Sequence, residues 1–273
     1  MICKVISVST SGYYAWVKRG RTFRKKQEDL AVIIHFLFHK NSQRYGSRRI
    51  QKALEDRGYY PSRAKVSRIM KTLGLHSRPP KRFKVTTDSN HQDPIAPNRL
   101  NRNFKVEKMN QAWVGDITYV FTKEGWLYLS ILIDLYSRRV IGYATGTQMT
   151  TTLPLKALKM ALGTRNKIQN TIHHTDRGSQ YTSKEYQKVM TAHGFQVSMS
   201  RKGDCWDNAV AESFFKTLKT ESLNRLRFKT RKEAHLEIIS YLSWYNSKRM
   251  HSSIGYMSPM QYETLNQPLN QVA

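Results

Sequence analysis

Three acidic residues in the second half of the chain have the type and placement that catalysis could use. Asp116 lies in an apolar and aromatic run typical of a β-strand, Asp176 opens an Asp-Arg-Gly-Ser segment, and Glu212 lies in a stretch with helical spacing. An ionised carboxylate in an apolar strand is costly unless it reaches solvent or a positive group, so Asp116 is expected at an exposed edge or beside a cation. Taken singly, each acid also has an ordinary structural explanation.

The ordinary explanation for Glu212 is a solvated carboxylate on a helix surface or the acidic partner in a capping box. The helix is predicted over 204–221, where Asp204 or Asp207 can accept hydrogen bonds from its first free N–H groups. A capping box needs Ser or Thr three residues before the Glu, and this chain has Ala209 there. The spacing places Glu212 beside the apolar stripe of the helix, so its role depends on which other acids approach it.

The three acids could act together in one reaction if they lie at one edge of a sheet. Carboxylates gathered there would repel and raise one another's pKa values unless divalent cations neutralised them. Oxygen-only ligands suit Mg²⁺ or Mn²⁺, and two such ions about 3.5–4 Å apart can activate a water or a 3′-hydroxyl in phosphoryl transfer. Asp116, Asp176 and Glu212 are therefore the candidate catalytic and metal-binding residues.

The elements around these acids predict an α/β domain with a ribonuclease-H-like, mixed five-stranded sheet and flanking helices. In that fold the first and fourth strands are neighbours, which would bring Asp116 close to Asp176. The last helix would then offer Glu212 to the same edge. The strands are expected at 112–122, 126–134, 139–146, 171–176 and 195–199, and the helices at 152–162, 183–193 and 204–221.

The motifs around the acids read Trp-Val-Gly-Asp-Ile-Thr-Tyr, His-Thr-Asp-Arg-Gly-Ser-Gln-Tyr and Asp-Asn-Ala-Val-Ala-Glu-Ser-Phe-Phe-Lys-Thr-Leu-Lys. They resemble the DDE signature of retroviral-integrase-like insertion-sequence transposases, the products of a second reading frame. As in that family, 35 residues separate Asp176 from Glu212, and Lys219 follows Glu212 by seven positions. The likeness extends from Ser-Gly-Tyr-Tyr-Ala-Trp near the start to the Tyr-Asn-Ser-Lys-Arg-Met-His segment at 245–251.

The resemblance implies a transposase that cuts double-stranded DNA at an element's terminal inverted repeats and joins the freed 3′-hydroxyl to target DNA. Asp116, Asp176 and Glu212 would hold two Mg²⁺ or Mn²⁺ ions, with Asp116 bridging both. Lys219 would contact DNA near the scissile phosphate, and Asn208 would lie there too, orienting Glu212 or a water. A homo-oligomer is expected, and a partner protein from an upstream frame with another helix-turn-helix is possible in this family.

Two rival functions stay open at this stage. A ribonuclease-H-like nuclease would hydrolyse DNA without joining it. A catalytically inactive regulator descended from a transposase would bind DNA and do neither. The composition agrees with all three, since each acts on a nucleic acid.

The charge of the chain predicts a polyanionic partner. Lys and Arg outnumber Asp and Glu by 46 to 19 in 273 residues, and the excess is steepest in residues 1–110, with 25 against 7. Interleaving with 15 Tyr and 5 Trp favours nucleic acid over a membrane surface. No apolar run approaches the roughly 20 residues of a membrane span, no signal-peptide core is seen, and 2 Cys provide no disulfide framework or zinc site. A cytoplasmic location is expected by default.

The basic first part of the chain predicts a helix-turn-helix module over 24–77. Helical patterns at 24–40 and 47–57 precede a third helix that Ser62 can cap. If that helix enters a major groove, Arg63, Lys65 and Arg68 face bases or phosphates. The alternative is a three-helix bundle with a solvated basic face.

The remaining boundaries follow from composition. A short helix after Ser9 is expected in an N-terminal arm, residues 1–23, which is either a remnant of a unit begun in another frame or an ordinary arm. Residues 78–108 are basic, contain four of the eight prolines and are predicted as a linker. The catalytic core is assigned to 109–225 and a C-terminal helical extension to 226–273.

Several neighbours of the acids are interpreted as structural. Asp134 is expected to pair with Arg138 or Arg139. His173 and His174 are expected in hydrogen bonds or packing, because Mg²⁺ prefers oxygen ligands. The aromatic cluster of the last helix could stack on bases, but it is expected to pack that helix against the core; it comprises Trp244, Tyr245 and His251.

Overall fold

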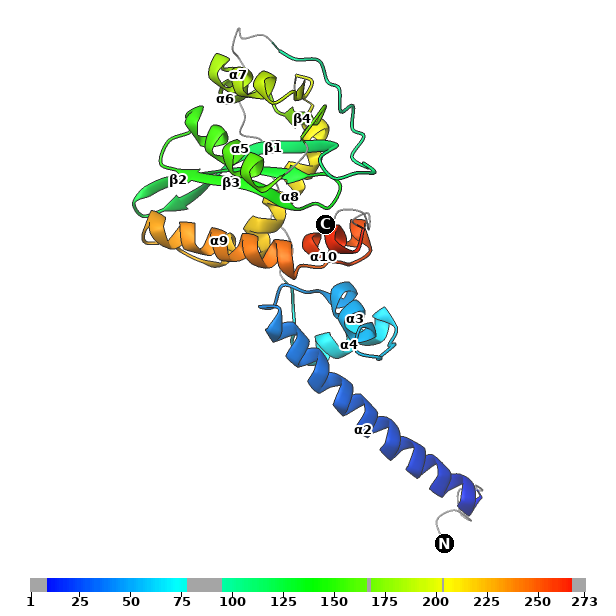
Figure 1. Cartoon of the computed structure of the whole chain (residues 1–273). Coiled ribbons are helices and arrows are strands. Elements are labelled where there is room, and N and C mark those ends of the chain that lie inside the picture. The colour runs from blue at the N-terminus through cyan, green and yellow to red at the C-terminus, as the bar shows by residue number, and fades with distance from the viewer. Residues whose placement is uncertain (1–8, 78–94, 166–167, 203, 267–273) are drawn as a thin grey trace. The chain divides into compact units, whose positions relative to one another are not determined.

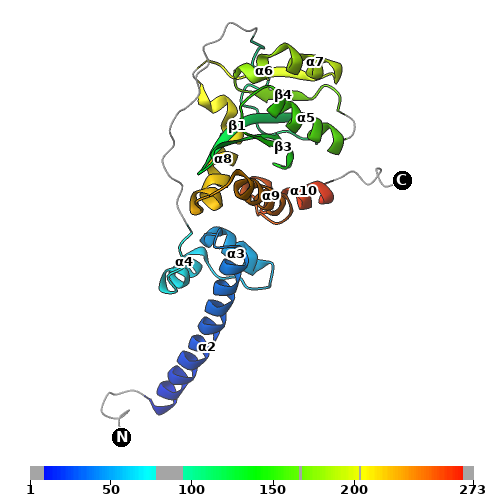
Figure 2. The same ribbon diagram turned by 90° about the vertical axis from the view of Figure 1, so that its left-hand side faces the viewer.

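The computed structural model describes residues 9–77, 95–165, 168–202 and 204–266. The chain divides into two compact units, residues 1–78 and 79–273, shown in Figures 1 and 2. Each unit has its own buried core. No helix among the described residues is long and apolar enough to cross a membrane.

Within its described residues, 9–77, the first unit is helical, with α2 Thr10–Lys40, α3 Ser47–Glu55 and α4 Arg63–Thr72. The hydroxyl of Ser9 caps α2 by accepting a hydrogen bond from the Gly12 N–H (3.1 Å). The prediction of a short helix followed by a separate one was therefore wrong, because a single helix runs through the expected boundary at residue 23. Gly20 lies within it, and one glycine costs a helix only about 1 kcal/mol relative to alanine.

The last two helices of the first unit form as predicted. Gly58 follows α3 with φ of +80°, a left-handed conformation that glycine adopts without strain. Ser62 caps α4 by accepting from the Lys65 N–H (3.3 Å). All three helices contribute to one apolar interior, which includes Leu30, Ile34, Leu37, Phe38, Ile50, Leu54, Val66, Ile69 and Met70.

The second unit is built on the predicted mixed five-stranded sheet. The strand order is β3-β2-β1-β4-β5. Strands β1 and β4 are parallel neighbours, as expected, whereas β1–β2 and β2–β3 are antiparallel and β4–β5 is parallel. The strands are β1 Ala112–Thr122, β2 Gly125–Asp134, β3 Val140–Gly146, β4 Ile172–Thr175 and β5 Gln196–Met199.

Helices cover both faces of this sheet (Figures 1 and 2). One face packs against α5, α6 and α7, and the other against α8 and α9. Gly142 allows α5 to approach β3 closely, since a Cβ there would lie 2.2 Å from the Ala157 carbonyl oxygen. The helices are α5 Thr152–Thr164, α6 Ser179–Thr182, α7 Lys184–Ala192, α8 Ala209–Glu221, α9 Arg231–Ser247 and α10 Pro259–Leu265.

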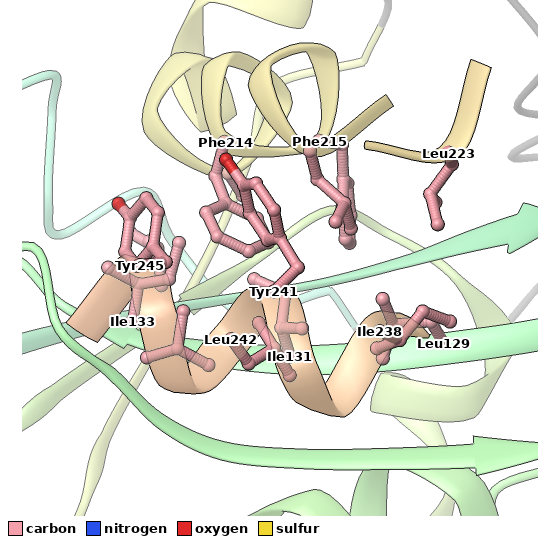
Figure 3. Packing of buried hydrophobic residues seen from close by; sticks show 14 of the residues in the cluster. Leu129, Ile131, Ile133, Phe214, Phe215, Leu223, Ile238, Tyr241, Leu242 and Tyr245 are labelled. Carbon is pink, nitrogen blue, oxygen red and sulfur yellow. The ribbon is translucent and has the colours of Figure 1, made fainter. Parts of the chain in front are cut away.

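Helix α9 shares the core of the sheet, so the described part of the C-terminal helical extension predicted over 226–273 packs on the catalytic core. Its buried side chains meet β2 and α8 in one continuous cluster (Figure 3). The helical pattern in the sequence predicts α9 but does not say which surface α9 covers. The residues labelled in Figure 3 are Leu129, Ile131, Ile133, Phe214, Phe215, Leu223, Ile238, Tyr241, Leu242 and Tyr245.

The end of the predicted linker also belongs to the core. Leu100 is buried, and the Ser198 hydroxyl accepts hydrogen bonds from the N–H groups of Arg99 (2.9 Å) and Leu100 (3.1 Å). Residues 95–108 are therefore not a free connector, because long-range hydrogen bonds hold part of them. Residues 78–94 of the predicted linker lie outside the described residues.

Candidate active site

Asp116 and Asp176 lie at neighbouring places along two parallel strands, Asp116 within β1 and Asp176 directly after β4. The last β1–β4 pair joins Val114 to His174, and each aspartate follows its member of that pair by two residues. Asp116 Oδ1 accepts from the Ile117 N–H (2.7 Å), and Asp176 Oδ1 accepts from the Gly178 N–H (3.0 Å). Both side chains are partly exposed. The parallel pairing thus brings the two acids to the same edge.

Glu212 reaches this edge from the first turn of α8. The helix is preceded by a 3₁₀ helix, Cys205–Asn208, which Asp204 caps by accepting from the Trp206 N–H (3.2 Å). The α-helix therefore begins at Ala209, later than predicted. Helix α8 packs on β1, which places partly buried Glu212 near Asp116.

The loop before α8 is anchored by Asp207, whose role the sequence did not reveal. Its side chain is fully buried and accepts from Arg201 Nη2 (2.7 Å), Arg102 Nε (2.9 Å) and Asn98 Nδ2 (2.9 Å). The hydrogen bond from Arg201 holds the pKa of Asp207 well below its usual value. Two of these partners are more than a hundred positions away, so only the folded chain shows the cluster.

Asn208 ties the start of α8 to the strand that carries Asp116. Its Nδ2 donates to the Gly115 carbonyl oxygen (3.3 Å), and its side chain is 4% exposed. Its Oδ1 is buried and has no hydrogen-bond partner among the described residues. Asn208 thus links the start of α8 to the residue before Asp116, and its part in orienting Glu212 or a water stays a prediction.

The acids influence one another electrostatically. Burial raises the pKa of Asp116 well above its usual value, and the charges of Asp176 and Glu212 raise it further. Burial also raises the pKa of Glu212. The positive charge of Lys219 lowers the pKa of Asp116. Burial lowers the pKa of Lys219 itself. Negative charge at this edge is therefore incompletely compensated by the chain.

The donor set fits a hard divalent cation. The three acids offer only oxygen, burial and the charges of the other two acids raise the pKa of Asp116, and the Asn208 Oδ1 is buried with no hydrogen-bond partner among the described residues. In the described part of the chain, no three Asp, Glu, His or Cys side chains stand close enough to form a ready metal site. Asp116, Asp176 and Glu212 are the candidate ligands, which a cation would have to draw closer together.

The two histidines of β4 are held in hydrogen bonds, as predicted. His173 Nε2 lies 3.1 Å from the Tyr186 hydroxyl, and His174 lies between the hydroxyls of Ser198 (2.8 Å) and Ser200 (3.2 Å). Burial lowers the pKa of His173 to about 3 and that of His174 to about 4. Both rings are therefore neutral near pH 7.

Asp134 is structural, as predicted, but its expected partners were wrong. It accepts from the N–H groups of Asn110 and Tyr136 (both 3.0 Å) and lies 3.6 Å from Arg165 Nη2. Arg138 instead donates to the Phe104 carbonyl oxygen (2.9 Å). Arg139 pairs with Glu263 (2.6 Å). Arg138 and Arg139 are close to Asp134 in sequence, but their side chains bind other segments of the chain.

The aromatic cluster of α9 packs the helix, as expected. The Tyr245 ring is buried and meets Phe214 edge to face, with centroids 4.9 Å apart. It meets the His251 ring in the same way at 4.7 Å. Trp244 lies against the same core.

The basic residues predicted to contact DNA lie in two places. Arg63 and Arg68 are exposed on α4 and Lys65 is partly exposed. Lys219 lies on α8, with its Nζ 5.1 Å from the centre of the Tyr119 ring. The structure makes them accessible, and their contact with DNA stays a prediction.

Comparison with known families assigns most of the chain. Models described as "Integrase core domain" match residues 106–205 and 193–259, and one described as "HTH-like domain" matches 24–83. The 31 kDa protein of insertion element IS600 from Shigella sonnei is 43% identical over 96% of this chain and 97% of its own length. Transposase InsF of insertion sequence IS3A from Escherichia coli (strain K12) is 38% identical over 97% and 93%.

One solved structure is similar over much of the chain. It is a simian T-cell lymphotropic virus intasome in complex with the PP2A regulatory subunit B56 gamma. The match has 17% identity and a TM-score of 0.49, and it covers 81% of this chain and 72% of that chain.

Proposed function

We infer that this chain, which belongs to the insertion-sequence transposases with an integrase core domain, cuts DNA at the ends of its element and joins the 3′ ends to target DNA. The observation that carries the inference is the pairing of β1 with β4, which sets Asp116 and Asp176 at neighbouring places, together with the packing of α8, the helix of Glu212, on β1. The raised pKa of Asp116, caused by burial and by the charges of Asp176 and Glu212, supports the grouping of the three acids. Such a cluster suits phosphoryl transfer better than a structural role.

Asp116, Asp176 and Glu212 would serve as the ligands of two Mg²⁺ or Mn²⁺ ions. When bound, such ions activate the attacking water or 3′-hydroxyl and stabilise the leaving oxygen. Asn208 keeps the helix carrying Glu212 in register with the strand carrying Asp116. Lys219, whose positive charge lowers the pKa of Asp116, would hold a DNA phosphate beside the acids.

The first unit would deliver DNA to this site. Arg63 and Arg68 project from α4, and Lys65 is partly exposed beside them. In a helix-turn-helix the corresponding helix enters the major groove, so these side chains would recognise the terminal repeats. We expect the protein to act in the cytoplasm on DNA, as a homo-oligomer, with or without a helix-turn-helix partner from an upstream frame.

The test uses labelled DNA carrying the element ends, a plasmid target and Mg²⁺. The wild-type chain should cut the labelled ends and join them to the plasmid. Asp116→Asn should abolish both steps while leaving DNA binding nearly unchanged, because it removes a ligand and not a DNA contact. Glu185→Gln, which changes an exposed acid on α7, is the matched control and should retain both activities.

The result also separates the rival functions. Cutting without joined product would show a nuclease. Binding with neither cutting nor joining by the wild-type chain would show a regulator. Equal activity of Asp116→Asn and wild type would show that the Asp116 carboxylate takes no part in the reaction.

A further inference from the structure

A cavity of about 480 Å³ adjoins the candidate active site through Lys219. It lies between the tip of the β1–β2 hairpin and the segment that follows α8, and we call it the hairpin pocket. Its volume is within the roughly 300–1,000 Å³ typical of small-molecule sites. It is lined by Tyr119, Val120, Phe121, Lys123, Trp126, Lys219, Leu223, Asn224, Leu226, Arg227 and Phe228.

The walls of the hairpin pocket are held in place by hydrogen bonds between distant segments. The Lys123 N–H donates to the Phe228 carbonyl oxygen (3.1 Å), which joins the hairpin tip to residues after α8. Arg231, at the start of α9, donates from Nε to the Trp126 carbonyl oxygen (3.0 Å) and from its N–H to Glu124 Oε2 (2.8 Å). The pocket is therefore a formed feature of the fold.

Aromatic rings form one side of the pocket and stay exposed. The Phe121 side chain is 66% exposed and that of Trp126 is 44% exposed. Trp126 meets Phe121 and Tyr119 edge to face, with centroids 5.3 and 5.0 Å apart. These contacts orient the rings while leaving surfaces open, an arrangement suited to stacking against a flat ligand.

The charge around these rings is positive. Lys123, Lys219 and Arg227 line the pocket, and no acidic residue lines it in the described part of the chain. The carboxylate of nearby Glu124 accepts the hydrogen bond from Arg231. Exposed aromatic rings beside cationic side chains match the two parts of a nucleotide, since a base stacks on the rings and its phosphate meets the cations.

We propose that the hairpin pocket holds an unpaired nucleobase of the DNA strand whose phosphate lies at the carboxylates. The proposal rests on the proposed function, because it places a DNA strand at Asp116. Lys219 links the two locations, since it follows Glu212 by about two turns of α8 and its Nζ lies 5.1 Å from the centre of the Tyr119 ring. A strand that reaches the acids therefore passes the pocket with an adjacent nucleotide.

The test measures binding of the full chain to three fluorescent probes by anisotropy, without divalent metal. The probes are a blunt duplex, the same duplex with a few unpaired nucleotides at one end, and that extended duplex with abasic sites in the extension. The wild-type chain should bind the extended duplex about tenfold or more tightly than the blunt one. The abasic probe should lose this preference, because it keeps the phosphates and lacks the bases.

Variants locate the effect. Trp126→Ala and Phe121→Ala should abolish the preference, whereas Phe121→Tyr should keep it. Leu236→Ala, which removes an exposed apolar side chain from α9, is the matched control and should behave as wild type. Circular dichroism and the melting temperature check that each variant folds.

The outcomes separate this proposal from the proposed function. Equal binding of all probes by a chain that cuts and joins DNA would overturn the pocket and leave the function standing. A preference lost in Trp126→Ala, in a chain that neither cuts nor joins, would support the pocket and overturn the function. A change of oligomeric state in Trp126→Ala with an unchanged probe preference would show a protein interface instead, which also overturns the proposal.

Discussion

The amide of Asn208 donates a hydrogen bond to the carbonyl oxygen of Gly115, the residue that precedes Asp116 on β1 (3.3 Å). Glu212 follows Asn208 by about one turn of the helix. This single bond therefore relates the strand that carries one acid to the helix that carries another. Because the bond joins the two elements directly, its loss would change the relative position of the two acids.

We expect Asn208→Ala to lower the rate of DNA cleavage by about 10²-fold, the size of effect that small misplacements of catalytic groups produce. The melting temperature should change little, since one neutral hydrogen bond contributes only about 1 kcal/mol. Cleavage of labelled end DNA across a Mg²⁺ titration measures both rate and metal requirement. An unchanged rate with an unchanged Mg²⁺ midpoint would show that Asn208 positions nothing.

Binding of Mg²⁺ should stabilise the wild-type chain in the absence of DNA. Cations bound between the carboxylates remove the repulsion that raises the pKa of Asp116. At a Mg²⁺ concentration of about 100 times Kd the gain is about 2.7 kcal/mol. Thermal unfolding should show a higher melting temperature for wild type and Glu185→Gln, and a much smaller rise for Asp116→Asn. Equal shifts in all three chains would mean that Mg²⁺ binds elsewhere.

The sheet could be predicted from the sequence, and so could the places of its acids along the chain, because both depend on local patterns. Runs of alternating or continuous apolar residues mark β1 and β2, and the likeness of the element order to a ribonuclease-H-like sheet predicts that β1 and β4 are neighbours. Once β1 and β4 are parallel neighbours, Asp116 and Asp176 must lie at one edge. Their meeting was therefore predictable before any coordinates.

Contacts between distant segments were not predictable in this way. The pairing of Asp134 with Arg165 joins residues on different elements, and the hydrogen bonds of Asp207 join the α8 loop to Arg102. The hairpin pocket is another example, since Tyr119 and Arg227 line it from distant segments, which the bridge between Thr122 and Phe228 joins. Local hydrophobic periodicity does not indicate such contacts, so the residues that make them are known only from the folded structure.

Asp134 should make the stability of the chain depend on pH. Burial raises its pKa to about 6 in the folded chain, against about 3.9 for an unperturbed aspartate. The folded state thus binds this proton more tightly than the unfolded state. Asp134 therefore makes its full contribution to the free energy of unfolding below about pH 4, and this contribution is lost as the pH rises through about 6.

The Asp134→Asn variant tests this dependence, because it keeps an acceptor oxygen and carries no charge. Relative to wild type, its free energy of unfolding should rise by about 2–3 kcal/mol between pH 4 and pH 7. Urea unfolding at several pH values measures the difference, with Asp56→Asn at an exposed position as control. A constant difference between the variant and wild type would show that Asp134 titrates normally.

A buried ion pair between Glu221 and Arg249 joins the end of α8 to the segment after α9. Arg249 Nη2 lies 2.8 Å from Glu221 Oε1, and Arg249 Nε donates to Oε2 (2.8 Å). The Tyr241 hydroxyl also donates to Oε2 (2.8 Å). Both charged side chains are at most 10% exposed, so removing one would leave the other buried without its counter-charge.

We expect Arg249→Met to lower the free energy of unfolding by about 3–5 kcal/mol. The double variant Glu221→Leu, Arg249→Met should be less destabilised than Arg249→Met alone, because no buried charge is left without a partner. Urea unfolding of wild type, both single variants and the double variant gives the coupling energy. If the two single effects add in the double variant, the pair does not act as a unit and the buried-charge explanation fails.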